Sequence, residues 1–287
     1  NTMSKLKIAI QKSGRLSEKS LELLRECGIK ITNGNQKLKT TSSNFPIEIL
    51  FLRDDDIPQY VEQNVADIGI LGENEVWEKN RKVETIRKVG FGNCRLSLAI
   101  PKDDLYTDLS YFNNKKIATT YPKILEKFCK ENDLKVEIEE ISGSVEIAPG
   151  IGLANCIFDI VSTGSTLLMN GLKEVETVTT SEAVLIKSLE LSDEKQQILS
   201  KLLFRIQSVI YSRENKYIVL NAPNEAVPSI IQVLPGMKSP TVLPLADKGW
   251  SSIHSVIKEE EFWDIIDQLK SLGAQGILVI PIEKMIL

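Results

Sequence analysis

The chain has 287 residues, 42% hydrophobic and 26% charged, which is ordinary for a globular protein of two or three domains. Its 35 basic and 39 acidic residues give a net charge of −4, so a basic surface built for nucleic acid is not supported. No apolar run approaches the ~20 residues of a membrane helix, and no secretory segment precedes the first predicted strand.

Strand and helix patterns alternate over the first 72 residues. Strands are predicted at residues 5–10, 47–52 and 65–71. A helix is predicted from Ser17, a favoured N-cap, to Gly28, which would end it in a left-handed conformation. Pro58 lies near the start of a second helix. This alternation predicts a largely parallel α/β sheet.

The middle of the chain repeats this pattern, and the end changes it. Residues 95–213 predict strands at 95–100, 116–120, 135–141 and 158–161, and helices at 124–132, from Leu167, and at 193–213. From residue 216, strands at 217–220, 241–245, 252–258 and 276–282 are interleaved with helices at 225–234 and 260–272. This β-α-β-β-α-β order predicts a small ferredoxin-like domain.

Cysteine and histidine contribute little recognisable chemistry. Cys27, Cys94, Cys129 and Cys156 form no CxxC motif and have no histidine nearby, which argues against zinc and dithiol sites. Free thiols fit a reducing cytoplasm. The single histidine, His254, leaves histidine-based catalysis almost nothing to use, and we interpret all five residues as structural.

The strongest local signal is the loop Asp159–Thr166, where an apolar strand runs into small and hydroxylated residues. Gly164 permits close approach of a ligand, and Ser162, Thr163, Ser165 and Thr166 supply hydroxyl donors beside the backbone amides. No lysine follows the glycine as in a Walker A loop, so a monophosphate fits better than a nucleotide. A capped helix start without a ligand is an equally good interpretation of composition alone.

Three other loops follow predicted strands and would gather at the same edge of an α/β sheet. Lys12 and Arg15 would face the crevice, although an ordinary solvated turn is the better explanation of residues 12–15 when they are taken alone. Arg53 is interpreted as a phosphate ligand. Asp54–Asp56 could help to hold Mg²⁺ among polyphosphates, but capping of the following helix is the favoured interpretation. Glu73 and Asn74 could bind a base or ribose, and Glu146 is a candidate for ribose hydroxyls.

Nine segments, in order, resemble the long form of the ATP phosphoribosyltransferase family. They cover residues 6–285, nearly the whole chain, and comprise IAIQKSGRLS (8–17), LRDDDIP (52–58), DIGILGEN (67–74), CRLSLA (94–99), GSVEIAP (143–149), DIVSTGSTL (159–167), ENKYIVL (214–220), SPTVLPLA (239–246) and ILVIPIEKM (277–285). Each segment is modest alone, but nine in the same order are specific.

The resemblance implies a fold and a division of the chain. The fold would be α/β, with a two-lobed core like periplasmic binding proteins and a C-terminal ferredoxin-like (ACT-like) domain. Lobe I would comprise residues 1–92 with 180–211, lobe II residues 93–179 with the phosphate loop, and the regulatory domain residues 212–287.

The resemblance also implies a reaction. ATP would be joined to 5-phosphoribosyl 1-diphosphate, giving N1-(5-phosphoribosyl)-ATP and pyrophosphate in the first step of histidine biosynthesis. Mg²⁺ is implied because two polyphosphates must share one crevice. Nucleophile and leaving group both belong to substrates, so alignment and charge stabilisation would suffice without a strong protein base.

By similarity, the site residues divide into three groups. The donor would be held by Ser162–Thr166, with Asp159 and Glu146 near its ribose. Lys12, Arg15 and Arg53 would be catalytic and would handle ATP phosphates and the leaving pyrophosphate. Resemblance to the short form implies that the Arg53 position serves a neighbouring subunit's site, which requires at least a dimer. ATP would also contact Lys37, Glu73 and Asn74; Lys37 stands where many relatives carry arginine.

The C-terminal unit would bind histidine as a feedback inhibitor. The corresponding pocket positions are Asn221, Met237, Thr241, Val256 and Gly276. The family also implies a homo-oligomer, dimer and hexamer, in the cytoplasm, with no nucleic-acid or membrane partner.

Three other functions stay open from the sequence. A solute-binding protein would share the two lobes but would need export and no paired phosphate loops. A ligand-sensing transcriptional regulator would need a helix-turn-helix and a basic patch. A non-catalytic paralogue would be expected to lose Lys12, Arg15, Arg53 or the 159–166 loop, and this chain retains them.

Overall fold

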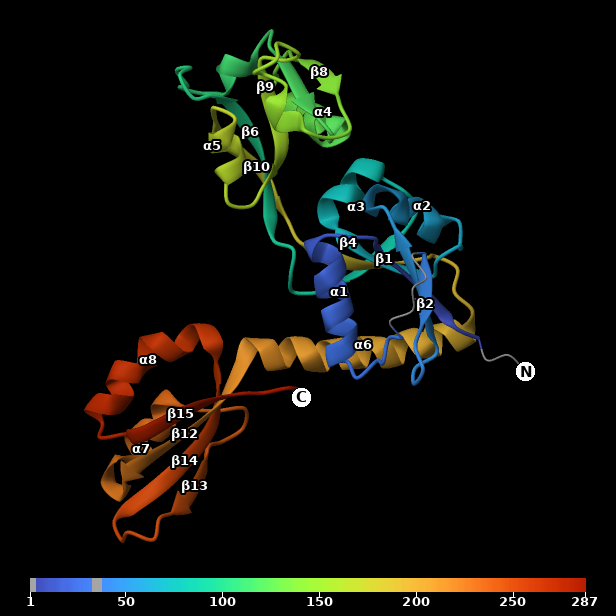
Figure 1. Cartoon of the computed structure of the whole chain (residues 1–287). Helices are drawn as coiled ribbons and strands as arrows, with labels where there is room; N and C mark the ends of the chain where they lie inside the picture. The colour runs from blue at the N-terminus through green and yellow to red at the C-terminus, as the bar shows by residue number, and fades with distance from the viewer. Residues whose placement is uncertain (1–3, 33–37) are drawn as a thin grey trace. The chain divides into compact units, whose positions relative to one another are not determined.

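The computed structural model describes residues 4–32 and 38–287, which form three β-sheets in two compact units (Figure 1). Unit 1 comprises the described residues up to Glu22 and from Lys30 to Gln196, and unit 2 comprises Leu23–Ile29 and Gln197–Leu287. The three-part division at residues 1–92 with 180–211, 93–179 and 212–287 stays a prediction.

The first sheet of unit 1 has six strands in the order β2-β3-β1-β4-β11-β5. Their bounds are Leu6–Gln11 (β1), Lys39–Thr41 (β2), Ile47–Leu52 (β3), Ile68–Gly72 (β4), Glu84–Lys88 (β5) and Ala183–Lys187 (β11). Strands β3, β1 and β4 are parallel, whereas β2, β11 and β5 are antiparallel to their neighbours. The prediction of a largely parallel sheet is therefore wrong for the outer strands, because β11 returns from the second sheet and runs against β4.

Helices α1 (Arg15–Glu26), α2 (Ile57–Glu62) and α3 (Glu73–Lys79) accompany this sheet. Helix α1 begins at Arg15, so the prediction that Ser17 is its N-cap is wrong. The Glu18 N–H donates to the Gly14 carbonyl at 3.1 Å, which already closes the first turn before Ser17. The predicted end of the helix is confirmed, because Gly28 has a φ of +75°.

The second sheet of unit 1 has five strands in the order β10-β6-β9-β7-β8. Their bounds are Cys94–Pro101 (β6), Lys116–Thr119 (β7), Glu137–Glu140 (β8), Cys156–Val161 (β9) and Leu172–Ser181 (β10), with helices α4 (Pro122–Glu131) and α5 (Ser165–Met169). Leu98, Phe112 and Phe158 are fully buried in its core. Strand β9 ends at Val161 and strand β5 at Lys88. Ser162, which follows β9, and Lys88 both line a cavity that is described below.

Two short passages connect the two sheets of unit 1. One runs from the end of β5 at Lys88 to the start of β6 at Cys94, and the other is the single residue Glu182 between β10 and β11. Cys94 and Ser181 are register partners, so the two passages lie side by side where β6 meets β10. Residues near these passages therefore touch both sheets.

Unit 2 contains most of the long helix α6 (Asp193–Glu214) and the predicted β-α-β-β-α-β arrangement. The elements are β12 (Asn215–Pro223), α7 (Val227–Val233), β13 (Thr241–Pro244), β14 (Trp250–Lys258), α8 (Glu259–Ser271) and β15 (Gln275–Pro281). Its four strands are antiparallel in the order β13-β14-β12-β15. Ile218, Ile230, Ile253 and Leu269 are fully buried in one core, and the ferredoxin-like prediction is confirmed.

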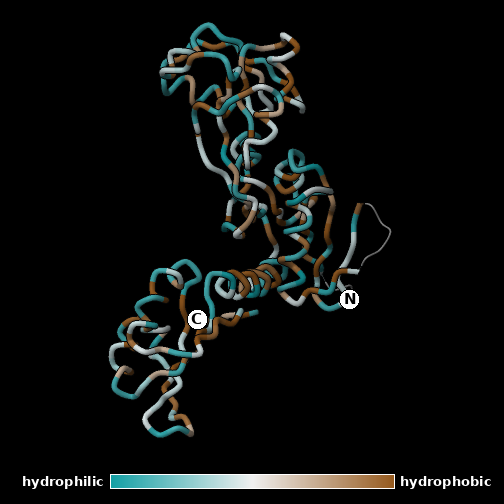
Figure 2. Tube along the Cα trace, turned by 60° about the vertical axis from the view of Figure 1, so that its left-hand side comes forward, coloured by the Kyte–Doolittle hydropathy of each residue, from teal (hydrophilic) through white to brown (hydrophobic). Residues whose placement is uncertain are grey.

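Hydrophilic residues interrupt the apolar ones throughout the chain (Figure 2). Among the described residues, no helix combines the length and the apolar character that crossing a membrane requires.

Candidate active site

A cavity of about 360 Å³ in unit 1 is lined by residues from both sheets. Arg15, the first residue of α1, and Ser162, the first residue after β9, both line it. Asp54, Asn74 and Glu75 contribute polar groups to the same cavity. The structure therefore brings one predicted basic residue and the start of the predicted phosphate loop to one space.

The loop at residues 162–166 has unused backbone donors. Gly164 has a φ of +83°, a left-handed conformation that favours glycine. The hydroxyls of Thr163 and Ser165 are hydrogen-bonded to each other at 3.0 Å. Within residues 4–32 and 38–287, the amides of Thr163, Gly164 and Thr166 donate to no protein acceptor. Free amides beside hydroxyls on a glycine turn can bind an anion.

Two carboxyl groups lie close to this loop. Burial, together with the negative charge of Glu146, raises the pKa of Asp159, on β9, to about 6. Asp159 accepts the Ile160 N–H at 2.8 Å, which favours the charged form. Glu146 lies in a short 3-10 turn (Val145–Ile147) that packs beside β9. Both groups can accept hydrogen bonds from sugar hydroxyls.

Lys12 and Arg53 each follow a parallel strand of the first sheet. Lys12 is exposed after β1, and its N–H donates to the Leu52 carbonyl at 2.7 Å. The Arg53 side chain is 68% exposed and pairs with Asp55 at 3.2 Å. Arg53 lines a second cavity of about 720 Å³, which also reaches Glu140 at the end of β8 and residues of the segment 141–153 that follows it. Lys37 lies outside the described residues.

The aspartates after Arg53 do not cap a helix as predicted. Asp54–Asp56 form a 3-10 turn, and Asp56, at the N-cap position of α2, makes no side-chain capping hydrogen bond. Asp54 accepts the Asp55 N–H at 2.9 Å, and burial raises the pKa of Asp54. Asp54 and Asp55 line the second cavity, so their carboxylates lie beside the space where ligands would bind.

Asn74 is buried, and both ends of its side-chain amide are hydrogen-bonded to protein groups. Its side-chain oxygen accepts from the Ser181 hydroxyl at 3.0 Å, and its amide nitrogen donates to the Tyr121 hydroxyl at 3.2 Å. Glu73 accepts the Glu182 N–H at 3.2 Å. Glu73 therefore contacts Glu182, one of the two passages between the sheets, and Asn74 contacts Ser181 at the end of β10. Both residues also line cavities.

Glu75 and Tyr121 form a polar contact that the sequence did not single out. The Tyr121 hydroxyl donates to Glu75 at 3.3 Å. Burial, with the charge of Asp54, raises the pKa of Glu75 to about 7. Glu75 lines both cavities described above. The two residues are far apart in sequence, and no local motif could have paired them.

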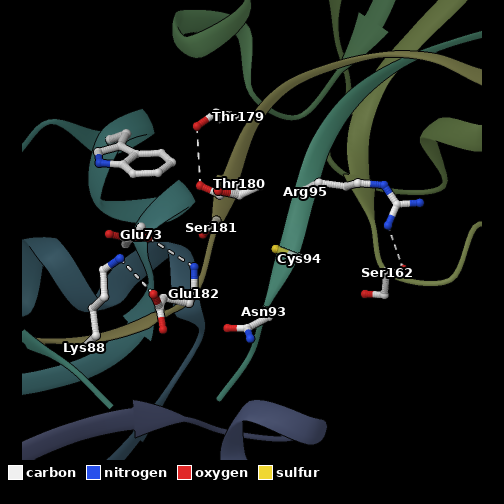
Figure 3. Close-up of a pocket in the computed structure, with 11 residues that line it drawn as sticks. Glu73, Lys88, Asn93, Cys94, Arg95, Ser162, Thr179, Thr180, Ser181 and Glu182 are labelled. Atoms are coloured by element: carbon white, nitrogen blue, oxygen red, sulfur yellow. Dashed lines mark hydrogen bonds and ion pairs between the residues drawn. The ribbon is translucent and has the colours of Figure 1, made fainter. Parts of the chain in front are cut away.

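A third cavity of about 660 Å³ lies along the two passages between the sheets (Figure 3). Lys88 and Glu182 form an ion pair of 2.9 Å on one side of it. On the other side, Arg95 reaches Ser162, whose carbonyl oxygen accepts from Arg95 Nη1 at 2.9 Å (Figure 3). Ser162 therefore borders two of the three cavities.

Three of the five predicted regulatory residues share one face of the sheet in unit 2. Asn221 is the register partner of Ser252 on β14, and Thr241 is the partner of His254. Val256 belongs to the same face because strand side chains alternate with period two. Gly276, at the start of β15, is close enough that an added Cβ would lie 3.6 Å from the Asn221 amide nitrogen. The fifth residue, Met237, is 54% exposed before β13.

His254 and the cysteines have structural surroundings, as predicted. His254 is hydrogen-bonded to the hydroxyls of Tyr217 (2.8 Å) and Ser252 (3.0 Å) within the sheet of unit 2. All four cysteines are free thiols. Burial raises the pKa of Cys27 to about 11 and that of Cys156 to about 12, so neither is a ready nucleophile.

Comparison with known proteins gives two adjacent family matches and full-length relatives. The family model for ATP phosphoribosyltransferase matches residues 53–208, and the model for the HisG C-terminal domain matches residues 212–284. The ATP phosphoribosyltransferase of Phocaeicola vulgatus is 58% identical over 98% of this chain and 100% of its own length.

Solved structures add similarity of fold. The ATP phosphoribosyl transferase (HisG:HisZ) complex from Thermotoga maritima matches with a TM-score of 0.60 and 28% identity over 70% of this chain and 98% of that chain. The substrate binding protein of an amino acid ABC transporter matches with a TM-score of 0.51 over 74% of this chain and 95% of that chain. At 10% identity the second match concerns the fold alone.

Proposed function

This chain belongs to the ATP phosphoribosyltransferase family, and we propose that it joins ATP to 5-phosphoribosyl 1-diphosphate in the first step of histidine biosynthesis. The observation that carries the proposal is the cavity lined by both Arg15 and Ser162. Ser162 begins the loop in which, among the described residues, the amides of Thr163, Gly164 and Thr166 have no protein partner. Such a space suits a phosphorylated sugar that must be held against a second polyanion.

The reaction needs no strong base from the protein. N1 of adenine attacks the anomeric carbon of the donor, the bond from that carbon to the diphosphate oxygen breaks, and pyrophosphate leaves with the bonding electrons. Lys12, Arg15 and Arg53 would stabilise the charge that develops on pyrophosphate and would hold the ATP phosphates. The only histidine, His254, belongs to the sheet of unit 2. This fits a reaction in which the substrates supply the nucleophile and the leaving group and the protein supplies no base.

The donor would bind through its 5-phosphate and its ribose. We assign the phosphate to the amides and hydroxyls of Ser162, Thr163, Gly164, Ser165 and Thr166. Asp159 and Glu146 would accept hydrogen bonds from the ribose hydroxyls. The pKa of Asp159, about 6, leaves it mainly ionised at neutral pH and able to accept.

ATP would lie beside the passages between the sheets. Arg15, Glu73 and Asn74 are the proposed contacts among the described residues, with Lys37 as a further candidate. Support for Asn74 is indirect, because its side chain is hydrogen-bonded to Ser181 and Tyr121. We therefore expect Asn74 to act chiefly by shaping the cavity wall.

Mg²⁺ would arrive with the polyphosphates. Among the described residues, no group of three histidine, cysteine or acidic side chains could hold a metal ion. Mg²⁺ generally binds through one or two carboxylates, waters and substrate phosphates. Asp54 and Asp55 line the cavity next to Arg53 and fit that role. When bound, the ion would neutralise part of the charge on the two substrates.

Unit 2 would provide feedback inhibition by histidine, bound near Asn221, Met237, Thr241, Val256 and Gly276. Inhibition from a separate unit requires two states of the enzyme with different affinities for histidine. The family resemblance also leads us to propose a homo-oligomer, dimer and hexamer. Self-association is supported by exposed apolar side chains on the edge strands of this unit, namely Leu243 (49%), Leu278 (57%) and Ile280 (42%). Free thiols support a cytoplasmic location.

The test is product formation by the purified full chain. Protein, ATP, 5-phosphoribosyl 1-diphosphate and Mg²⁺ should give a rise in product absorbance, which EDTA should abolish and histidine should reduce. Binding of ATP without product would support a binding protein and overturn the enzyme proposal. Product formation that histidine leaves unchanged would overturn only the regulatory part.

A pair of variants on one helix sharpens this test. Arg15→Ala should lower kcat/KM by about 100-fold, as expected for a charged group that stabilises the transition state. Arg25→Ala, which removes an exposed arginine from the last turn of the same helix, should leave activity unchanged. Equal activities of the two variants would show that Arg15 has no role in catalysis.

A further inference from the structure

We infer that Arg95 is a positioning residue for the phosphate loop, and that it acts by fixing the carbonyl of Ser162 so that the Thr163 amide faces the donor. This inference rests on the proposed function, because it concerns how the same loop is prepared for the 5-phosphate. Arg95 itself would touch no reacting atom.

The contact joins two neighbouring strands. Arg95, the second residue of β6, is the register partner of Val161, the last residue of β9. Its side chain extends past the end of β9, and Nη1 donates to the carbonyl oxygen of Ser162 at 2.9 Å (Figure 3). Arg95 therefore holds the first residue of the loop where the strand ends.

Glu174 fixes the direction of this contact. Arg95 Nε and Nη2 donate to the two oxygens of Glu174 at 2.6 and 2.7 Å. Glu174 in turn accepts from the hydroxyls of Ser97 (2.9 Å) and Thr177 (3.2 Å). The donors of a guanidinium lie in one rigid plane, so two bonds to Glu174 determine where Nη1 points.

Because a peptide group is planar, the contact with the Ser162 oxygen also sets the direction of the Thr163 N–H. The C=O and N–H of one trans peptide group lie in a plane and point in opposite directions. Holding the Ser162 oxygen toward Arg95 therefore directs the Thr163 N–H to the other side. That amide donates to no protein acceptor among the described residues, so Arg95 keeps a free donor in a fixed direction before the ligand arrives.

A purely structural ion pair would predict a different result. The Arg95 and Glu174 side chains are 34% and 23% exposed, and an ordinary pair of this kind would affect folding without favouring one substrate. A positioning role predicts weaker binding of the donor and unchanged binding of ATP. The ratio of the two KM values separates the interpretations.

The decisive variant is Arg95→Lys, which keeps the charge but cannot bond to Glu174 and Ser162 together. The KM for 5-phosphoribosyl 1-diphosphate and the Kd for ribose 5-phosphate should rise by about tenfold, the effect of losing one hydrogen bond from a charged group. The KM for ATP should change by less than about twofold. Glu174→Gln, which frees the guanidinium to turn, should shift the donor KM in the same direction by a smaller factor.

Arg81→Lys is the matched control, because Arg81 Nη1 also donates to a glutamate, Glu62, at 3.2 Å away from the loop. It should leave both KM values unchanged. Equal effects on the two substrates, or an unchanged donor KM in Arg95→Lys, would overturn the inference. If Arg95→Lys does not fold, the donor KM of Glu174→Gln decides alone. Failure of the wild-type chain to form product would instead overturn the proposed function.

Discussion

An ion pair between Asp67 and Lys195 ties the first turn of α6 to the first sheet. Asp67 is 4% exposed, and both of its carboxylate oxygens accept from Lys195 Nζ at 2.9 Å. One oxygen also accepts the Lys7 N–H of β1 at 2.7 Å. We predict that Lys195→Met strongly destabilises unit 1, because it leaves a buried carboxylate with one backbone donor.

The expected size follows from burial. Removing one partner of a buried pair costs about 3–5 kcal/mol. Lys195 is itself 24% exposed, so water can reach part of the site, and we expect the lower end, about 3 kcal/mol, or roughly a 100-fold fall in the ratio of folded to unfolded protein. Lys187→Met is the control, because its partner Glu84 is 54% exposed and such a pair contributes about 0–1 kcal/mol.

Urea unfolding can measure unit 1 separately. Of the three tryptophans, Trp77 lies on α3 in unit 1, whereas Trp250 and Trp263 lie in unit 2. Replacing the latter two by phenylalanine makes fluorescence report unit 1, which avoids treating two units as one transition. The reasoning is refuted if Lys195→Met costs no more than Lys187→Met in this background.

Three further predictions concern the site and its supports. Thr163→Asp should abolish binding of ribose 5-phosphate in calorimetry, because a carboxylate would face the phosphate; unchanged affinity would show that the loop is misassigned. Burial raises the pKa of Glu75 from its ordinary 4.5 to about 7. The folded state therefore favours the protonated carboxyl, and the stability that this protonation contributes is full below pH 4.5 and is lost as the pH rises through 7. Glu75→Gln should therefore raise the urea midpoint more at pH 8 than at pH 5, and an equal effect at both would contradict this. Glu78 accepts the N–H groups of Lys123 and Ile124 at 3.0 Å each, so Glu78→Ala should cost about 1–2 kcal/mol and speed hydrogen exchange of those amides; unchanged exchange would count against a capping role.

Four strands, β2, β5, β10 and β11, were not predicted from the sequence. Strand β10, the longest of them, shows why. In β10 the residues Val175 and Val178 both pack against one core, although they are three residues apart. The register of β10 against β6 shifts between Glu174 and Glu176 and again between Thr177 and Thr179. These irregularities break the alternation that a strand pattern requires, so a sequence pattern could not reveal the element.

The sequence could predict those residues of the candidate site that directly follow a strand. Lys12, Arg53 and the loop at 162–166 each follow a strand, and this placement was visible from the sequence. The supporting contacts were not, because they join distant residues: Tyr121 and Glu75 are 46 positions apart, and Arg95 and Glu174 are 79 apart. The pairing of β6 with β9 and β10 brings Arg95 and Glu174 together. Tyr121, just before α4, meets Glu75 because helices α3 and α4 are in contact. No local motif encodes either arrangement.

Acidic side chains in a site for polyanions require a physical explanation. Asp54 and Glu75 line the cavities that Arg15 and Arg53 also line, and Asp159 lies on β9, shortly before the proposed phosphate loop. Burial raises the pKa of all three. For Glu75, whose pKa rises to about 7, this removes about half of the negative charge near neutral pH. A protonated carboxyl can donate to a phosphate oxygen instead of repelling it. Mg²⁺ bound to the substrates would be attracted by the charge that remains. The arginines then need to balance only the phosphate charge left over, which explains how a chain with a net charge of −4 can hold two polyphosphates.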